Sequence, residues 1–142
     1  MSQLSTFHVG QYLFGIDVGL VQEVVRLQLI TPVPLAAPEI AGLINLRGEV
    51  LTAIDLRSRL RLPPSDRTRE PVNVVVRVDD EPVCLLVDEI GGVLEVSGVP
   101  FDQTPSTVDE RVRGLLLGAY TLPDRLLLEL NVRQVLSLAA AA

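Results

Sequence analysis

The stretch GLINLRGEVLTAIDLRSRL, residues 42–60, contains the features that decide how this chain folds. Two apolar runs flank the pair Arg47-Gly48, and glycine adopts the positive φ of a two-residue hairpin turn at little cost. The second run ends at Asp55, whose carboxylate can accept hydrogen bonds from the free N–H groups of a following helical turn. The stretch therefore predicts a β-hairpin with Arg47 at its tip, followed by a capped turn of helix.

The same pattern recurs near the end of the chain. Residues 54–60 (IDLRSRL) and 130–136 (LNVRQVL) share the order apolar, Asp or Asn, apolar, Arg, two variable positions, Leu. Residues 114–132, which lead into the second heptapeptide, again read as strand, turn and strand, with a longer turn over Tyr120–Asp124. We therefore expect Asn131 to cap a helix as Asp55 does.

A second pair of segments is also similar. LFGIDVGLVQEV (13–24) and LLVDEIGGVLEV (85–96) both run from an apolar strand through Asp and Gly to Glu-Val. The repeats predict a single domain with two similar halves, 1–62 and 71–136, joined by the polar linker PPSDRTRE (63–70). Each half is too small to be stable alone, so we expect the two to share one core.

The composition favours a β protein. Of the 142 residues, 48% are hydrophobic but only 4% are aromatic, so valine, leucine and isoleucine must fill the core. Ten prolines and ten glycines break the chain into many short elements. The spacing of Val18, Val21, Val24 and Val25 predicts one short helix over 18–26. Strands are predicted near 5–10, 12–16, 43–47, 50–54, 72–79, 82–88, 92–97, 114–119 and 126–130.

Charge and cysteine usage exclude several classes of protein. The net charge is −6 and there is no basic stripe of the kind that binds nucleic acid. The single cysteine, Cys84, excludes an internal disulfide and a cysteine-rich zinc site. Pro32, Pro34 and Pro38 interrupt the nearly uncharged segment 27–46, and the first residues do not read as a signal peptide. We expect a cytoplasmic protein without a cofactor and without direct membrane insertion.

The motifs together resemble the CheW family of chemotaxis coupling proteins. The resemblance covers about 7–136, and its most specific part is the NLRG to DLR stretch within 44–57. It implies two five-stranded, SH3-like barrels packed against each other. It also implies a scaffold that joins the cytoplasmic tips of chemoreceptors to the regulatory domain of the histidine kinase CheA, with no cofactor and no reaction. The segments 99–114 and 115–125 depart from the family pattern.

The resemblance assigns a receptor surface. The family's receptor-associated arginine lies in the NLRG motif, which places it here at Arg47, beside Gly48. The VQEV stretch lies near the receptor in the family, which adds Val21 and Glu23. Two alternatives stay open: Arg47 can be a solvated turn residue paired with Glu23 or Glu49 of its own chain, and Val21 can be a core residue.

The resemblance also implies that barrel ends contact the kinase. Apolar residues near hairpin ends are the candidates: Leu13 and Leu35 in the first half, and Leu115, Leu117 and Tyr120 in the second. For each of them the alternative is burial in the core. Five arginines in and before the linker, Arg57, Arg59, Arg61, Arg67 and Arg69, either meet an acidic partner or form a solvated segment.

Two alternatives to the adaptor stay open, and the first is a dimeric hydrolase like an aspartic protease. GIDVG (15–19) has the apolar-Asp-x-Gly form of aspartic proteases, and two halves can supply two aspartates, Asp17 and Asp88, that share a proton. However, Val18 replaces the expected hydroxyl residue, and His8, the only histidine, cannot build a metal site alone. The second alternative is a CheW-like scaffold in a motility pathway other than flagellar chemotaxis.

Overall fold

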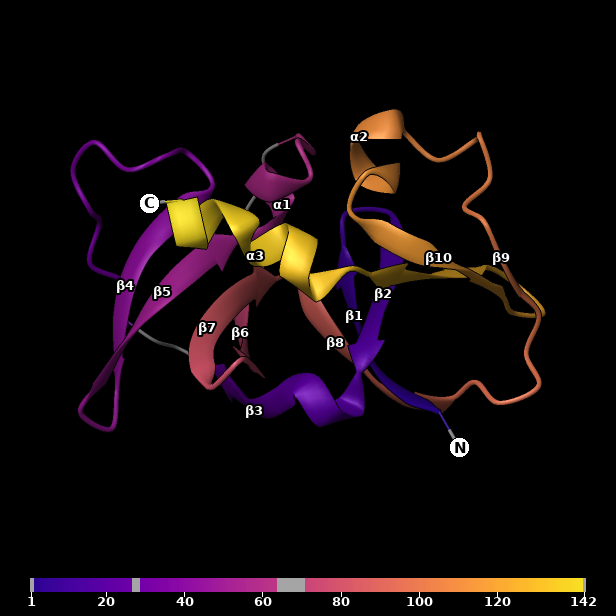
Figure 1. The fold of residues 1–142 in the computed structure, drawn as a ribbon, viewed down its shortest axis with the longest axis horizontal. Coiled ribbons are helices and arrows are strands. Elements are labelled where there is room, and N and C mark those ends of the chain that lie inside the picture. The colour runs from indigo at the N-terminus through magenta and orange to yellow at the C-terminus, as the bar shows by residue number, and fades with distance from the viewer. Residues whose placement is uncertain (1, 27–28, 64–70, 142) are drawn as a thin grey trace.

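The computed structural model describes residues 2–26, 29–63 and 71–141. They form eleven strands, three α-helices and a 3₁₀ turn (Figure 1). The strands are β1 (Gln3–Val9), β2 (Tyr12–Asp17), β3 (Val21–Arg26), β4 (Ile40–Leu46), β5 (Glu49–Asp55), β6 (Val72–Val78), β7 (Glu81–Val87), β8 (Glu89–Glu95), β9 (Phe101–Asp102), β10 (Leu116–Thr121) and β11 (Leu126–Leu130). The helical elements are η1 (Val18–Leu20), α1 (Leu56–Arg59), α2 (Glu110–Arg113) and α3 (Val132–Ala141).

The strands pair into two sheets, and each sheet takes strands from both halves of the chain. The six-stranded sheet has the order β8-β1-β2-β11-β10-β9, and the five-stranded sheet has the order β3-β6-β7-β5-β4. The β6–β7 hairpin completes a sheet begun by β3, β4 and β5, while the β1–β2 hairpin completes a sheet of later strands. The prediction of a mainly β protein built from two units is confirmed.

The two strand orders correspond one to one. Replacing β3, β6, β7, β5 and β4 by β8, β1, β2, β11 and β10 converts the five-stranded order into the six-stranded one without β9. Each sheet also contains one parallel pair at the equivalent place, β5 with β7 and β11 with β2. This correspondence supports the sequence repeat. The boundaries 1–62 and 71–136 stay a prediction, and most of the linker lies outside the described residues.

Both sheets curl so that their two edges approach each other. In the five-stranded sheet, Val25 of β3 and Ile44 of β4 belong to one apolar cluster although these strands are opposite edges. An isolated bridge joins Thr31 to Leu43, with both N···O distances 2.8 Å. Among the described residues no continuous strand ladder closes either sheet. Where two five-stranded barrels were predicted, the structure has two curled sheets, one of five strands and one of six.

The sixth strand of the other sheet was not predicted. β9 follows β8 and pairs with β10, much as Thr31 follows β3 and pairs with β4. Gly118 makes this pairing sterically feasible, because a Cβ there would lie 2.5 Å from the Phe101 ring. The strand is short and lies in the proline-interrupted segment, so no alternating pattern marks it in the sequence.

The predicted helix over 18–26 is wrong. Only Val18–Leu20 forms a 3₁₀ turn, which Asp17 caps by accepting a hydrogen bond of 2.8 Å from the N–H of Gly19. From Val21 to Arg26 the chain is strand β3, and half-buried and exposed residues alternate along it. The valines that gave helical spacing are β-branched and favour a strand, and pairing with β6 satisfies the backbone.

Apolar side chains fill three clusters. The largest lies between the sheets and joins Phe7 and Phe14 of the six-stranded sheet to Val74 and Leu85 of the five-stranded one. Leucines and valines of all three α-helices complete it. A smaller cluster lies inside the curl of each sheet, around Ile44, Leu51 and Cys84 in one and around Leu4, Leu13 and Leu127 in the other. Most strands are therefore apolar on both faces.

The helices that follow the two heptapeptides tie the sheets together. Asp55 caps α1 by accepting from the N–H groups of Arg57 and Ser58, at 3.1 and 3.4 Å, as predicted. Asn131 accepts from the N–H of Gln134 at 3.2 Å, which confirms the second predicted cap. Figure 1 shows α3 (yellow) reaching from the six-stranded sheet across to β5 of the five-stranded sheet.

The repeated arginine of the heptapeptides anchors each helix. Arg57 of α1 donates to Asp88 at 2.5 Å, and the same carboxylate oxygen accepts from the N–H of Gly10 in the β1–β2 turn at 2.8 Å. Arg133 of α3 donates to both carboxylate oxygens of Asp79, in the β6–β7 turn, at 2.6 and 3.0 Å. Each arginine therefore fastens its helix near the turn of a hairpin that completes the other sheet.

We predict that Arg57→Ala or Asp88→Asn lowers the free energy of unfolding by about 1–3 kcal/mol, because either change leaves a polar partner unsatisfied in a partly buried place. The side chains of Arg57 and Asp88 are 17% and 33% exposed. Arg133→Ala is the matched control, since Arg133 and Asp79 are 68% and 69% exposed and surface ion pairs stabilise little. Urea unfolding measures all three variants. Equal losses from the Arg57 and Arg133 variants would contradict the prediction.

Candidate functional site

The tip of the β4–β5 hairpin holds Arg47 in an unusual backbone conformation. Leu46 pairs with Glu49, so Arg47 and Gly48 are the two turn residues, with φ of 53° and 89°. Positive φ at both positions is what a two-residue type I′ turn requires, and only glycine adopts it without strain. Asn45 holds the turn by accepting from the N–H of Gly48 at 2.9 Å. The turn thus places Arg47 at the end of the hairpin.

Arg47 forms an ion pair with Glu23 of β3. Its guanidinium donates from Nη2 to Glu23 Oε2. Since β3 and β4 are opposite edges of the five-stranded sheet, this contact joins the two edges at the hairpin end of the curl. The Arg47 side chain nevertheless stays 68% exposed. The structure therefore brings together three of the four predicted receptor-binding residues, Glu23, Arg47 and Gly48.

Val21, the fourth predicted receptor-binding residue, lies on the same strand as Glu23. It is half-buried and packs against the large cluster between the sheets. The register of the pairing between β3 and β6 shifts between Val21 and Glu23, although both residues are half-buried in the alternating pattern of β3. Val21 therefore offers a partner only part of its side chain, beside the exposed ion pair.

A polar network extends from this ion pair across the neighbouring strand. The amide of Gln22 donates to Glu23 at 3.4 Å, and Arg77 of β6 donates to Gln22 at 2.8 Å. Arg77 also donates to the backbone carbonyl of Asp80 in the β6–β7 turn at 2.8 Å. The hydrogen bond from Arg47 lowers the pKa of Glu23, partly opposed by burial of the carboxylate. The charged side chains at this surface are thus held in place by one another.

The predicted kinase-binding residues separate into buried and exposed ones. Leu13 and Leu115 are each only 5% exposed and belong to the core, so they offer no surface. Leu35 is fully exposed, with a φ of 64°, in the segment before β4. Leu117 is 56% exposed at a bulge of β10. Tyr120 is half-buried and packs against the cluster inside the six-stranded sheet.

Phe101 is an apolar residue that the sequence analysis missed. It is exposed on β9, and its ring centroid lies 4.6 Å from that of Tyr120. Leu117 and Phe101 thus expose apolar surface on neighbouring strands of the six-stranded sheet. In Figure 1 these strands lie at one end of the molecule, and the segment that carries Leu35 lies beside β4 at the other. A lone phenylalanine after Pro100 is the only sequence signal of this surface.

The residues weighed for catalysis have structural partners instead. Asp17 caps the 3₁₀ turn, and Asp88 binds Arg57 and the N–H of Gly10. Burial raises the pKa of the Cys84 thiol to about 12, and the charge of Glu23 adds to the effect, so the nucleophilic thiolate is scarce at neutral pH. Among the described residues, no group of three or more His, Cys, Asp and Glu side chains is arranged to hold a metal ion. In the same part of the chain no helix is long and apolar enough to cross a membrane.

We predict that the pKa of Glu23, measured by carboxyl-carbon NMR titration, lies below the usual glutamate range and returns to it in Arg47→Gln. Arg47 stabilises the ionised carboxylate, so the ion pair contributes to folding above the ordinary pKa. That contribution is lost as the pH falls through the lowered pKa. Arg133→Gln, which removes a remote ion pair, should leave the Glu23 titration unchanged. A normal pKa in the parent chain would contradict the pairing.

Comparison with known proteins identifies the family. The model of the CheW-like domain matches residues 3–140. Chemotaxis protein CheW of Rhizobium meliloti is 31% identical over 125 residues, which cover 88% of this chain and 81% of that protein. Probable chemotaxis protein CheW of Rhizobium etli is 30% identical over 135 residues, covering 95% and 87%.

A solved structure has the same fold. The crystal structure of scaffolding protein TtCheW from Thermoanaerobacter tengcongensis superimposes with a TM-score of 0.78 at 23% identity, over 92% of this chain and 88% of that one. The family match overturns the aspartic-protease alternative. The chain belongs to the CheW family of chemotaxis adaptors, scaffolds that couple receptors to the kinase CheA and catalyse no reaction.

Proposed function

We propose that this chain works in the cytoplasm and joins the cytoplasmic tip of a transmembrane chemoreceptor to the regulatory domain of a CheA-type histidine kinase. The receptor would bind at Glu23, Arg47, Gly48 and the accessible part of Val21. The kinase would bind at the exposed leucines Leu35 and Leu117 and at the accessible part of Tyr120. The observation that carries the proposal is the strained conformation of Arg47, which keeps a charged fork at the tip of a hairpin. Strain of this kind persists where function requires it.

Arg47 has hydrogen-bond donors that Glu23 does not use and that a receptor carboxylate can bind. A guanidinium carries five N–H donors, and the contact with Glu23 uses only one of its nitrogens. A receptor carboxylate can therefore bind the remaining edge of the fork or displace Glu23 from it. Displacement would open the contact between the two edges of the five-stranded sheet. Receptor binding and the local shape of this sheet would then be coupled.

The kinase contact rests on apolar burial. Covering the exposed half of a leucine contributes about 1 kcal/mol, because burying a whole leucine contributes about 1.5–3 kcal/mol. Leu117 lies on β10, and the exposed Phe101 lies on the paired strand β9, opposite Tyr120. Leu35 offers a second apolar contact at the other end of the molecule. Leu13 and Leu115 are left out of the proposed surface because they are buried.

A scaffold with two such surfaces transmits a signal by differential contacts. Receptor states that bind the Arg47 surface with different affinity would shift the adaptor between arrangements, and the kinase would respond to the shift. The Arg47 surface lies on the five-stranded sheet, Leu117 lies on the six-stranded sheet, and Leu35 lies in the segment before β4. The large apolar cluster connects the two sheets, so partners at Arg47 and at Leu117 contact one framework.

A crossed mutation experiment tests the two surfaces. We predict that Arg47→Asn weakens binding of a receptor-tip fragment by about 10- to 100-fold, since a hydrogen bond to a charged group contributes about 1.5–3 kcal/mol. Asparagine is chosen because it tolerates positive φ, so the turn should form and the melting temperature should stay. Leu117→Gln should weaken binding of the kinase regulatory domain about fivefold to tenfold.

Each variant serves as the control for the other. Arg47→Asn should bind the kinase domain normally, and Leu117→Gln should bind the receptor fragment normally. Arg111→Gln on α2, which belongs to neither proposed surface, should change neither affinity. Calorimetric titration gives all the dissociation constants. If a correctly folded Arg47→Asn variant binds the receptor with parental affinity, the proposed receptor surface is wrong.

A further inference from the structure

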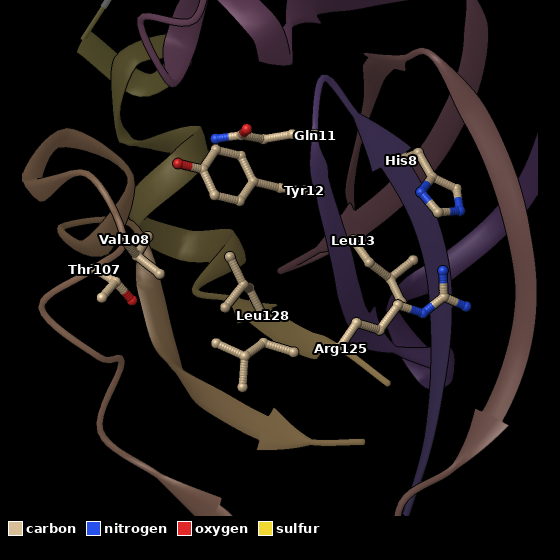
Figure 2. A pocket seen from close by; sticks show the side chains of 9 residues that line it. His8, Gln11, Tyr12, Leu13, Thr107, Val108, Arg125 and Leu128 are labelled. Atoms are coloured by element: carbon tan, nitrogen blue, oxygen red, sulfur yellow. The ribbon is translucent and has the colours of Figure 1, made fainter. Parts of the chain in front are cut away.

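A cavity of about 290 Å³ lies beside the β1–β2 hairpin (Figure 2). Its walls come from this hairpin, from the start of β11 and from the segment before α2. Pockets for drug-sized ligands span about 300–1,000 Å³, so this cavity suits one or two side chains better than a cofactor. None of the residues assigned to the receptor or kinase surface above lines it, apart from the buried Leu13.

The lining combines hydrogen-bond donors with an apolar floor. Arg125 and His8 supply nitrogen donors, and Gln11, Tyr12 and Thr107 supply amide and hydroxyl groups. Figure 2 shows the guanidinium of Arg125 directed toward the imidazole of His8. The floor consists of leucines and a valine: Leu13, Leu126, Leu128 and Val108. None of the described lining residues is acidic, although the chain has a net charge of −6.

Arg125 has only a weak intramolecular ion pair. Its partner is the carboxylate of Asp124, whose Oδ1 lies 4.0 Å from Arg125 Nε. The two side chains are 78% and 51% exposed, and ion pairs between exposed residues stabilise by roughly 0–1 kcal/mol. The guanidinium therefore keeps most of its donors for another carboxylate.

The turn of each half carries an arginine. Arg125 lies in the β10–β11 turn, the counterpart of the β4–β5 turn that holds Arg47. Glu23 supplies the carboxylate that pairs with Arg47. The contact of Arg125 with Asp124 is weaker, at 4.0 Å, so the two turns differ in how firmly their guanidinium is paired.

We propose that this cavity docks an acidic side chain, Glu or Asp with apolar neighbours, on a partner protein. The carboxylate would pair with Arg125 and accept from His8, and the apolar neighbours would cover the leucine floor. Charge complementarity selects this occupant, because the lining itself contains cationic and neutral donors and no acidic side chain, and Asp124 contacts Arg125 only at 4.0 Å. The proposal is independent of the Arg47 and Leu117 surfaces, so it can fail while they hold.

NMR titration of the ¹⁵N-labelled full chain tests the site, with the tripeptide acetyl-Leu-Glu-Leu-amide as probe. The expected result is saturable shifts of the His8, Gln11 and Arg125 signals at pH 7. Acetyl-Leu-Gln-Leu-amide, which lacks the charge, should bind at least tenfold more weakly. Arg125→Gln should weaken binding of the Glu peptide at least tenfold, whereas Arg111→Gln on α2 should leave it unchanged.

Three results would overturn the proposal. The first is equal binding of the Glu and Gln peptides, which would mean that charge is not recognised. The second is unchanged binding to an Arg125→Gln variant whose spectrum shows the parental fold. The third is binding of sodium acetate as tight as that of the Glu peptide, which would make the occupant a free carboxylate rather than a protein side chain.

Discussion

The exchange of hairpins between the two halves is the constraint on which the rest of this structure depends. β3, β4 and β5 need β6 and β7 to complete their sheet, and β8, β10 and β11 need β1 and β2. Each sheet also contains a parallel pair formed between the two halves, β5 with β7 and β11 with β2. Neither half can therefore form a finished sheet alone. The large apolar cluster then joins the faces on which the sheets meet, so that the loss of one sheet exposes the core of both.

This framework separates arginines that hold the fold from arginines that point outward. Arg57 and Arg133 occupy the same position of the repeated heptapeptide, and each fastens a helix near a hairpin turn. Arg47 and Arg125 occupy equivalent turns at the ends of the curled sheets. The first is paired with Glu23, and the second has only a weak contact with Asp124. Duplication has thus supplied two similar turns, and the surrounding carboxylates have made them chemically different. A scaffold gains distinct surfaces in this way without any change to its core.

Local features of this fold could be predicted from the sequence, whereas long-range pairing could not. The Arg47-Gly48 turn and the caps at Asp55 and Asn131 depend on a few neighbouring residues, and all three are present. The strand β3 was mistaken for a helix because four valines within 18–26 have helical spacing, and the pairing of β3 with β6 overrides that spacing. The burial of Leu13 and Leu115 could not be predicted from the sequence either. Both faces of most strands are apolar, so alternation does not reveal which leucines face solvent. The exchange of hairpins between the two halves leaves no local signal, since the sequence indicates where strands occur but not which strands pair.

Native-state hydrogen exchange of the full chain most directly tests the interdependence of the two sheets. The slowest amides of the β1–β2 hairpin and of the β6–β7 hairpin lie in different sheets. Because each sheet is built from both halves, both sets should exchange with the same free energy, equal to that of global unfolding. If every amide of one sheet exchanged with a free energy lower by more than about 2 kcal/mol, that sheet would open on its own. Such a result would contradict a framework in which the two sheets unfold together.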